Sequence, residues 1–179
     1  MATVLYSASM SLDGFIAGPG GDMHWLTPYQ GPDPAVDALV GDVGALLVGR
    51  RTHDGDDPNR GTEQEGAFGG TWSGPIVVLT HRRPEAPVPH TTFVSDLHEA
   101  VLTATAAAGD KYVSILGADV ARQCLEAGFV DEILVGIVPV FLGDGVRLFD
   151  VRGGRAVRLE RIRLTHSEHS TNLWFRVLH

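Results

Sequence analysis

Four short segments of this chain place glycine, arginine or hydroxyl side chains at the end of an apolar run. They are residues 9–17, 48–52, 78–83 and 115–123. The planar donor groups of arginine suit phosphate oxygens, and a glycine at a helix start lets a phosphate approach free backbone N–H groups. Because open α/β sheets bind ligands at the carboxyl ends of their strands, we expect the four segments to converge on one phosphorylated ligand.

Two of these segments are basic, although the protein as a whole is acidic. One contains Arg50 and Arg51 and the other Arg82 and Arg83, whereas the formal net charge is −8. An average surface of that sign repels nucleic acid and anionic membranes, so neither is an expected partner. Two basic corners favour a ligand with several phosphates, which NADP satisfies better than NAD. The alternative is that each arginine pairs with a surface carboxylate.

The composition is that of a globular protein. Hydrophobic residues make up 44% of the 179 residues, so a single domain spanning 1–179 with a substantial core is expected. No apolar run reaches the ~20 residues of a membrane-spanning helix, and the first residues lack the pattern of a secretion signal. Cys124 is the only cysteine, so it cannot form a disulfide within the chain, which fits the reducing cytoplasm. The eight histidines show no paired spacing, and no metal site is expected.

Strand-like and helix-like segments alternate along most of the chain. The predicted strands are residues 3–9, 45–48, 76–79, 111–116 and 132–140. Three helices are predicted. One follows the N-cap Asp33 and includes Val43, one follows the N-cap Asp96, and one begins at Ala118. This alternation predicts an α/β fold with a mostly parallel sheet covered on both faces.

Two regions depart from that alternation. Residues 157–164 and 172–178 alternate apolar with polar side chains around a polar link at 165–171, which predicts an antiparallel C-terminal hairpin and hence a mixed sheet. Residues 54–73 are rich in glycine and acidic residues and are interpreted either as a long functional loop or as a weak helix.

Five short motifs occur in order along most of the chain, from residue 11 to residue 149. They are SLDGFIA (11–17), GRRT (49–52), VLT (78–80), GFVDE (128–132) and PVFLGDGVRLF (139–149). The ordered set resembles the dihydrofolate reductase superfamily, in the branch that looks like the C-terminal reductase domain of bacterial riboflavin biosynthesis (RibD). The resemblance implies a three-layer α/β/α fold, an eight- or nine-stranded sheet and NADPH as hydride donor. Relatives of this kind commonly pair through sheet edges, so it also implies a homodimer.

The resemblance assigns positions around the cofactor. The nicotinamide would lie against Ser9, Ile16 and Ala17. The pyrophosphate and the adenosine phosphate would contact Gly49, Arg50, Arg51 and Thr52. The adenosine side would contact Thr80, His81 and Arg82. A helix start at Gly117, Ala118, Asp119 and Val120 would cap the pyrophosphate.

The chain departs from the family pattern at the fourth segment, where the cofactor would approach, and at the expected substrate positions. Leu116 precedes Gly117 where members usually carry a glycine pair, and an acidic residue of the riboflavin reductases is replaced in the region of Ile115 and Leu116. The loop before Asp33 and Asp37 does not match the spacing of a folate-binding carboxylate. Neither the riboflavin substrate nor folate is therefore expected.

Three residues could contact a substrate. Asp13 could deliver a proton near the nicotinamide, although a turn role in Leu-Asp-Gly is the more common one. Trp25, with Asp22 beside it, could stack on a flat heteroaromatic substrate or cover an edge of the core. The leading hypothesis is an NADPH-dependent reductase of a small heterocyclic or carbonyl substrate. The alternative is a non-catalytic ligand-binding protein that retains the reductase fold.

Overall fold

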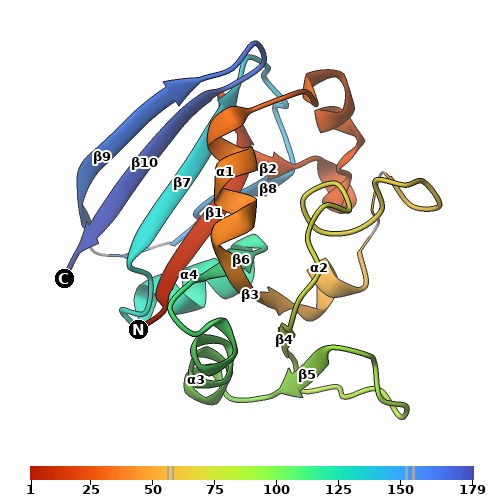
Figure 1. The fold of residues 1–179 in the computed structure, drawn as a ribbon. Helices are drawn as coiled ribbons and strands as arrows, with labels where there is room; N and C mark the ends of the chain where they lie inside the picture. Colours follow the sequence, from red (N-terminus) through yellow and green to blue (C-terminus); the bar gives the residue numbers. More distant parts are fainter. Residues whose placement is uncertain (56, 58, 152, 155) are drawn as a thin grey trace.

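An eight-stranded sheet forms the centre of the computed structural model, which describes residues 1–55, 57, 59–151, 153–154 and 156–179 (Figure 1). The strand order is β5-β4-β3-β6-β1-β7-β10-β9. All neighbours from β5 to β7 are parallel, and β10 pairs antiparallel with both β7 and β9. The strands are β1 (Thr3–Ser11), β3 (Val43–Gly49), β4 (Ile76–Leu79), β5 (Thr91–Val94), β6 (Tyr112–Leu116), β7 (Glu132–Val138), β9 (Arg158–His166) and β10 (Thr171–Leu178).

Helices cover both faces of this sheet, which confirms the predicted three-layer α/β/α fold. On one face, Leu39 of α1 (Pro34–Asp42) packs with Leu5 and Trp174 from the strands. On the other face lie α3 (Leu97–Ala108) and α4 (Ala118–Glu126), which contribute Ala104 and Cys124 to a second core cluster. The central strands read as continuous apolar runs because both of their faces are buried. Within the described ranges, no helix is long and apolar enough to cross a membrane.

The predicted helix starts are confirmed by their caps. The Asp33 carboxylate accepts hydrogen bonds from the backbone N–H groups of Ala35 and Val36. The Asp96 carboxylate accepts one from the N–H of Glu99 at 2.8 Å. Each aspartate satisfies a donor that the first helical turn leaves without a partner, which fixes where the helix begins.

Several boundaries differ from the prediction. Val43 was assigned to the first helix but begins β3, because its buried, β-branched side chain packs with Leu5 and Leu46 in the sheet core. The predicted strand 132–140 ends at Val138, before Pro139. Strand β5 was not predicted, nor was a separate two-stranded sheet of β2 (Phe15–Ala17) with β8 (Val146–Arg147). These strands are too short to show a period.

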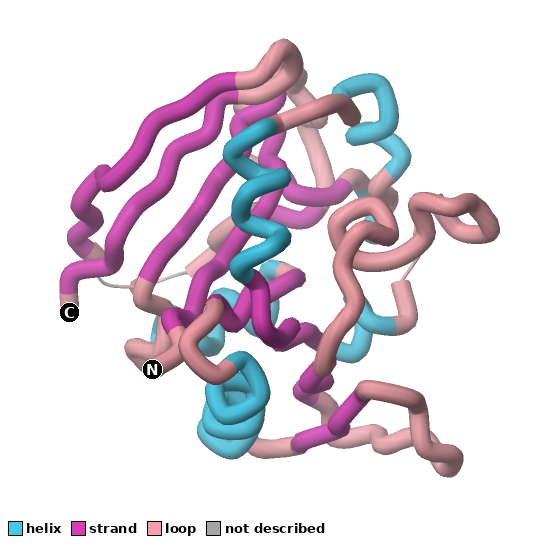
Figure 2. The backbone as a smooth tube through the Cα atoms, in the orientation of Figure 1, coloured by secondary structure: helices cyan, strands magenta, loops and turns pink. Residues whose placement is uncertain are grey.

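The segment between α2 (Arg50–His53) and β4 is a loop wherever it is described (Figure 2). Phe68 and Trp72 from this loop pack on the α1 face of the sheet. The Trp72 indole N–H donates to the carbonyl of Val43 at 3.0 Å. Of the two interpretations of residues 54–73, the loop is the correct one for the described residues.

The C-terminal hairpin is confirmed with a shorter link than predicted. Strand β9 extends to His166 and β10 starts at Thr171. The link is closed by the Ser167 N–H, which donates to the carbonyl of Ser170 at 2.9 Å. A bulge between Trp174 and Phe175 shifts the register. Strand β9 forms one edge of the sheet, and β5 forms the other.

Candidate functional site

The four segments singled out in the sequence leave four adjacent parallel strands. In spatial order they lie at the carboxyl ends of β4, β3, β6 and β1. Thr80 and Gly117 come directly after their strands, Gly49 is the last residue of β3, and Ser9 lies two residues before the end of β1. Strand β6 lies between β1 and β3 although it comes later in the chain. This is where strand order reverses, and open α/β sheets bind ligands outside the carboxyl ends at such a point.

The segments after β3 and β6 are in close contact. A Cβ atom added at Gly49 would lie 3.1 Å from Val120 in α4, and one at Gly117 would overlap the hydroxyl of Thr52 in α2. Gly117 also has a φ of +101°, which side-chain-bearing residues rarely adopt. The two glycines therefore allow the starts of α2 and α4 to lie side by side.

The segments after β3 and β4 are joined through Arg50. Its Nη1 donates to the backbone carbonyl of Arg82 at 2.8 Å, and its Nε donates to Asp54. Thr80, buried at the end of β4, shapes the same turn, because its hydroxyl accepts from the Arg82 N–H at 3.1 Å. Arg51, Thr52, His81 and Arg82 are exposed around this corner. The structure thus brings the predicted phosphate and adenosine residues together.

Two carboxylates lie among these cationic and N–H groups. Asp54 was not predicted as a site residue, although its spacing of four from Arg50 is that of an ion pair on a helix. Asp119, predicted to cap the pyrophosphate, instead accepts hydrogen bonds from Arg122 and Gln123 on its own helix at 3.0 Å. The start of α4 still offers the backbone N–H groups of its first turn.

Ser9 lies on β1 beside a small polar patch that sequence analysis missed. A Cβ atom at Gly136 would lie 3.0 Å from Asn172 Oδ1 and 3.9 Å from Ser9 Oγ. The Asn172 amide nitrogen donates to Asp33 Oδ2 at 2.7 Å, and the Ser170 hydroxyl donates to the same oxygen at 3.0 Å. The signal for this patch in the sequence was Asn172, a polar residue two positions before Trp174 and therefore on the same inward face of β10.

Asp13 holds the loop after β7 against the end of β1. Its Oδ1 accepts from the Ser11 hydroxyl at 2.6 Å and from the Leu142 N–H at 3.1 Å, and its Oδ2 accepts from the Gly143 N–H at 2.7 Å. The bond from Ser11, with those from the backbone, lowers the pKa of the Asp13 carboxyl. An ionised carboxylate with both oxygens engaged is a poor proton donor, which favours the turn role.

Ile16 and Ala17 follow this turn on β2. Ala17 is buried at 6% exposure, and Ile16 packs against the core cluster that contains Val120 of α4. Arg147 of β8 places its guanidinium 4.5 Å from the centre of the Phe15 ring. The two β2 residues that were predicted to contact the nicotinamide are therefore tightly packed against the core.

Asp22 and Trp25 lie in the segment before α1. Asp22 accepts hydrogen bonds from both the backbone N–H and the ring Nδ1 of His24 at 2.9 Å. Trp25 belongs to the 3₁₀ helix η2 (His24–Tyr29). Its indole nitrogen is buried and has no hydrogen-bond partner among the described residues. A buried donor of this kind requires an acceptor, which a bound molecule or water can supply.

Comparison with known protein families identifies the fold. The family described as the RibD C-terminal domain matches residues 2–174. The chain belongs to the RibD C-terminal domain family. A curated relative, the uncharacterized protein YwjB of Bacillus subtilis strain 168, is 26% identical over 152 residues, 82% of each chain.

Solved structures of similar fold support this membership. A protein of Shewanella sp. PV-4, provisionally named as a riboflavin biosynthesis protein, has a TM-score of 0.77 at 24% identity, with both chains covered completely. The riboflavin biosynthesis reductase Rib7 of Saccharomyces cerevisiae has a TM-score of 0.64 at 18% identity, covering 99% of this chain and 90% of that one. The deaminase/reductase of Thermotoga maritima has a TM-score of 0.67 at 17% identity, and 57% of its length is covered. At these identities the likeness shows the fold.

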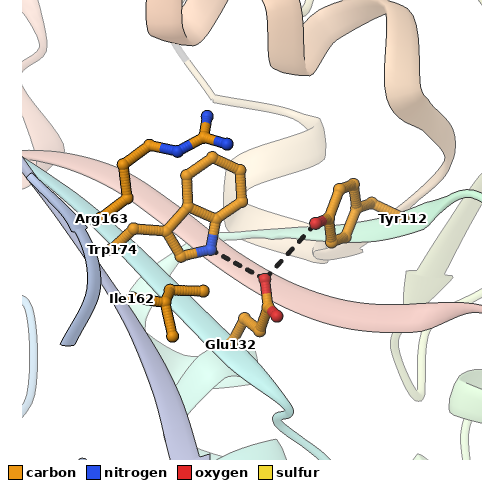
Figure 3. Close-up of a pocket in the computed structure, with 5 residues that line it drawn as sticks. All are labelled: Tyr112, Glu132, Ile162, Arg163 and Trp174. Atoms are coloured by element: carbon orange, nitrogen blue, oxygen red, sulfur yellow. Dashed lines mark hydrogen bonds between the residues drawn. The ribbon is translucent and has the colours of Figure 1, made fainter. Parts of the chain in front are cut away.

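A hollow in this RibD C-terminal domain protein lies at the opposite end of the sheet. It has a volume of about 210 Å³ and is lined by Tyr112, Glu132, Ile162, Arg163 and Trp174 (Figure 3). Tyr112 and Glu132 are the first residues of β6 and β7, whereas the four segments follow the carboxyl ends of the strands. This hollow is therefore separate from the predicted cofactor edge.

Proposed function

We propose that the protein is a reductase that uses NADPH to transfer hydride to a small planar heterocycle or carbonyl compound. The observation that carries the proposal is the convergence of four predicted segments at the carboxyl ends of four adjacent parallel strands. Membership of the RibD C-terminal domain family supports it, and two of the solved relatives are named as reductases.

The residues present fit a phosphorylated dinucleotide. The start of α4 offers backbone N–H groups to a pyrophosphate, and Gly117 keeps that start free of a Cβ atom. Arg51, His81 and Arg82 are exposed beside it and would hold the adenosine phosphate. Thr52 and Thr80 would position this corner through hydroxyl contacts. NADPH, when bound, supplies the hydride.

The substrate side would lie along β1 and η2. Ser9 is exposed on β1 near Gly136 and Asn172, and a flat ring would lie against this polar patch. The Trp25 indole N–H, buried without a partner in the described chain, would donate to a carbonyl or ring nitrogen of the substrate. Asp22 lies beside this helix, and Asp13 fixes its loop rather than delivering a proton. A substrate with an acceptor atom on a planar ring fits these groups.

The test is a fluorescence titration with NADPH and NADH. We expect saturable NADPH binding that is at least about tenfold weaker in Arg82→Ala, because one charge-assisted contact to phosphate is lost. Arg50→Ala should also weaken binding, since Arg50 supports the Arg82 turn. Arg176→Ala is the matched control, because Arg176 pairs with Glu160 at the far edge of the sheet. Failure of both dinucleotides to bind at millimolar concentration would reject the cofactor and the enzyme together.

A second candidate function is ligand binding without catalysis. The engaged carboxylate of Asp13 favours it, because no other proton donor was predicted beside the nicotinamide. Consumption of NADPH followed by absorbance with carbonyl and heterocyclic substrates separates the two functions. Binding without turnover of any of them would support the second.

We further propose that the protein is a homodimer of the cytoplasm that pairs through β9. This strand forms the edge of the sheet and exposes Leu159, Ile162 and Leu164 by 39–54%. An edge strand presents unpaired backbone groups, and antiparallel pairing with a second copy would satisfy them and cover the apolar side chains.

A further inference from the structure

Asp54 supplies an anion to Arg50, the arginine that supports the Arg82 turn at the proposed phosphate corner. Its carboxylate accepts a hydrogen bond from Arg50 Nε through Oδ2, and its Oδ1 lies 2.8 Å from His53 Nδ1. Asp54 follows the last residue of α2, and its own N–H donates to the Arg50 carbonyl at 2.9 Å. The ion pair is therefore built into the helix end.

The Arg50 guanidinium is also held from its other side. Its Nη1 donates to the carbonyl of Arg82 at 2.8 Å, so the group cannot swing away from Asp54 without losing that bond. A phosphate approaching this corner meets Arg50 together with the Asp54 carboxylate. The pair is only partly exposed, with 38% of the Arg50 side chain and 45% of the Asp54 side chain accessible, so water screens the repulsion incompletely.

The carboxylate carries its charge at neutral pH. Hydrogen bonds from Arg50 and then from His53 lower the pKa of the Asp54 carboxyl. Replacing the carboxylate by an amide keeps one acceptor oxygen for Arg50, turns an NH2 donor toward the ring nitrogen of His53, which accepts it in the other tautomer, and removes the negative charge. The two side chains differ by little in size, so the substitution removes the charge with little change in shape.

We propose that Asp54 competes with the phosphate of a bound dinucleotide for Arg50. This competition makes Asp54 a specificity residue, because it weakens the preference of the site for a dinucleotide that carries an additional phosphate. The inference rests on the proposed function, because it requires that a dinucleotide binds at this edge. NADPH carries a phosphate on its adenosine ribose where NADH carries a hydroxyl. Asp54 therefore opposes NADPH more than NADH.

The experiment compares Asp54→Asn with the parent protein in titrations with NADPH and NADH at low ionic strength. We expect the Asn variant to bind NADPH about fivefold more tightly and NADH within about twofold of the parent, as expected when one nearby unit charge of the same sign is removed. Raising the salt concentration should narrow the difference in NADPH affinity between the variant and the parent.

Asp110→Asn is the matched control. It removes the same charge from a surface pair, the N-terminal amine with Asp110, close to the first residue of β6 and so at the end of the sheet opposite the predicted cofactor edge, and it should leave both affinities unchanged. An Asp54→Asn variant whose NADPH affinity is unchanged, or whose affinities for both dinucleotides rise equally, overturns the role of Asp54 while NADPH binding by the parent upholds the proposed function. Absence of binding in both proteins rejects the function and the inference together.

Discussion

The Trp174 indole N–H donates a hydrogen bond to Glu132 Oε2 at 2.8 Å, which joins β10 to the first residue of β7. The hydroxyl of Tyr112, which lies on β6, donates to the same oxygen at a distance of 3.4 Å (Figure 3). The Arg163 guanidinium lies over the Trp174 ring, 5.1 Å from its centre. One carboxylate therefore connects three strands at the end of the sheet opposite the predicted cofactor edge.

The two hydrogen bonds to Glu132 should differ in strength. Double-mutant cycles that combine Glu132→Ala with Trp174→Phe or with Tyr112→Phe should give a coupling of about 1–2 kcal/mol for the tryptophan and less than about 0.5 kcal/mol for the longer tyrosine contact. Urea unfolding measures each free energy. Equal coupling energies would show that the strengths of the two hydrogen bonds do not follow their donor–acceptor distances.

Gly117→Ala should destabilise the fold. Its φ of +101° is unfavourable for alanine, and the new Cβ atom would overlap Thr52. We expect a loss of about 1–3 kcal/mol in the free energy of unfolding. Gly41→Ala is the control, because Gly41 lies in α1 with open space around its Cβ position, and it should stabilise by about 0.5 kcal/mol. A Gly117→Ala protein as stable as the parent would contradict this account.

Cys124 should be unreactive in the native protein. The side chain is fully buried in α4, and burial raises the pKa of its thiol to about 12. Because the thiolate is the reactive form, a disulfide reagent at pH 8 should modify the folded chain far more slowly than the chain in guanidinium chloride. Equally fast labelling in both conditions would show that α4 opens readily from the sheet.

Acid should weaken the contact between α1 and β10. Partial burial alone would raise the pKa of the Asp33 carboxyl, but hydrogen bonds from Asn172, Ser170 and the helix N–H groups outweigh it and lower the pKa. A lowered pKa in the folded state stabilises the fold above about pH 4, and this contribution is lost as the pH falls through the folded value.

Asp33→Asn tests this dependence, since asparagine keeps the N-cap and removes the titration. The variant should be less stable than the parent at pH 7 and should lose less stability between pH 7 and pH 3. Urea unfolding at the two pH values measures both. A parent and a variant that lose the same amount would assign the acid sensitivity to other carboxylates.

Leu164→Glu should dissociate the proposed dimer. Leu164 is 54% exposed on β9, and a carboxylate there would be buried against a second copy. Light scattering after size exclusion should give a dimer for the parent and a monomer for the variant. Leu102→Glu is the control, because Leu102 is 56% exposed on α3, and it should leave the mass unchanged. A monomeric parent at tens of micromolar would reject the dimer.

Local signals in the sequence were sufficient for most of the fold. Apolar runs of strand length located β1, β3, β4, β6 and β7, and Asp33 and Asp96 located two helix starts, because periodicity and capping act within a few residues. The direction of the strands followed from their alternation with helices. The ordering of glycines and arginines after these strands also indicated which segments would share one edge.

Tertiary structure decided which side chains meet. Asn172 binds Asp33 across 139 positions, Leu142 binds Asp13 across 129, and β2 pairs with β8 across more than 120 positions of the chain. Such contacts depend on how separate elements pack and leave no periodic trace in either partner. The sequence by itself determined most of the elements and the edge of the sheet at which four of its segments lie. Only packing determined that Asp13 is held by backbone N–H groups and that Arg50 bridges Arg82 and Asp54, because these bonds form between segments whose relative positions the sheet sets.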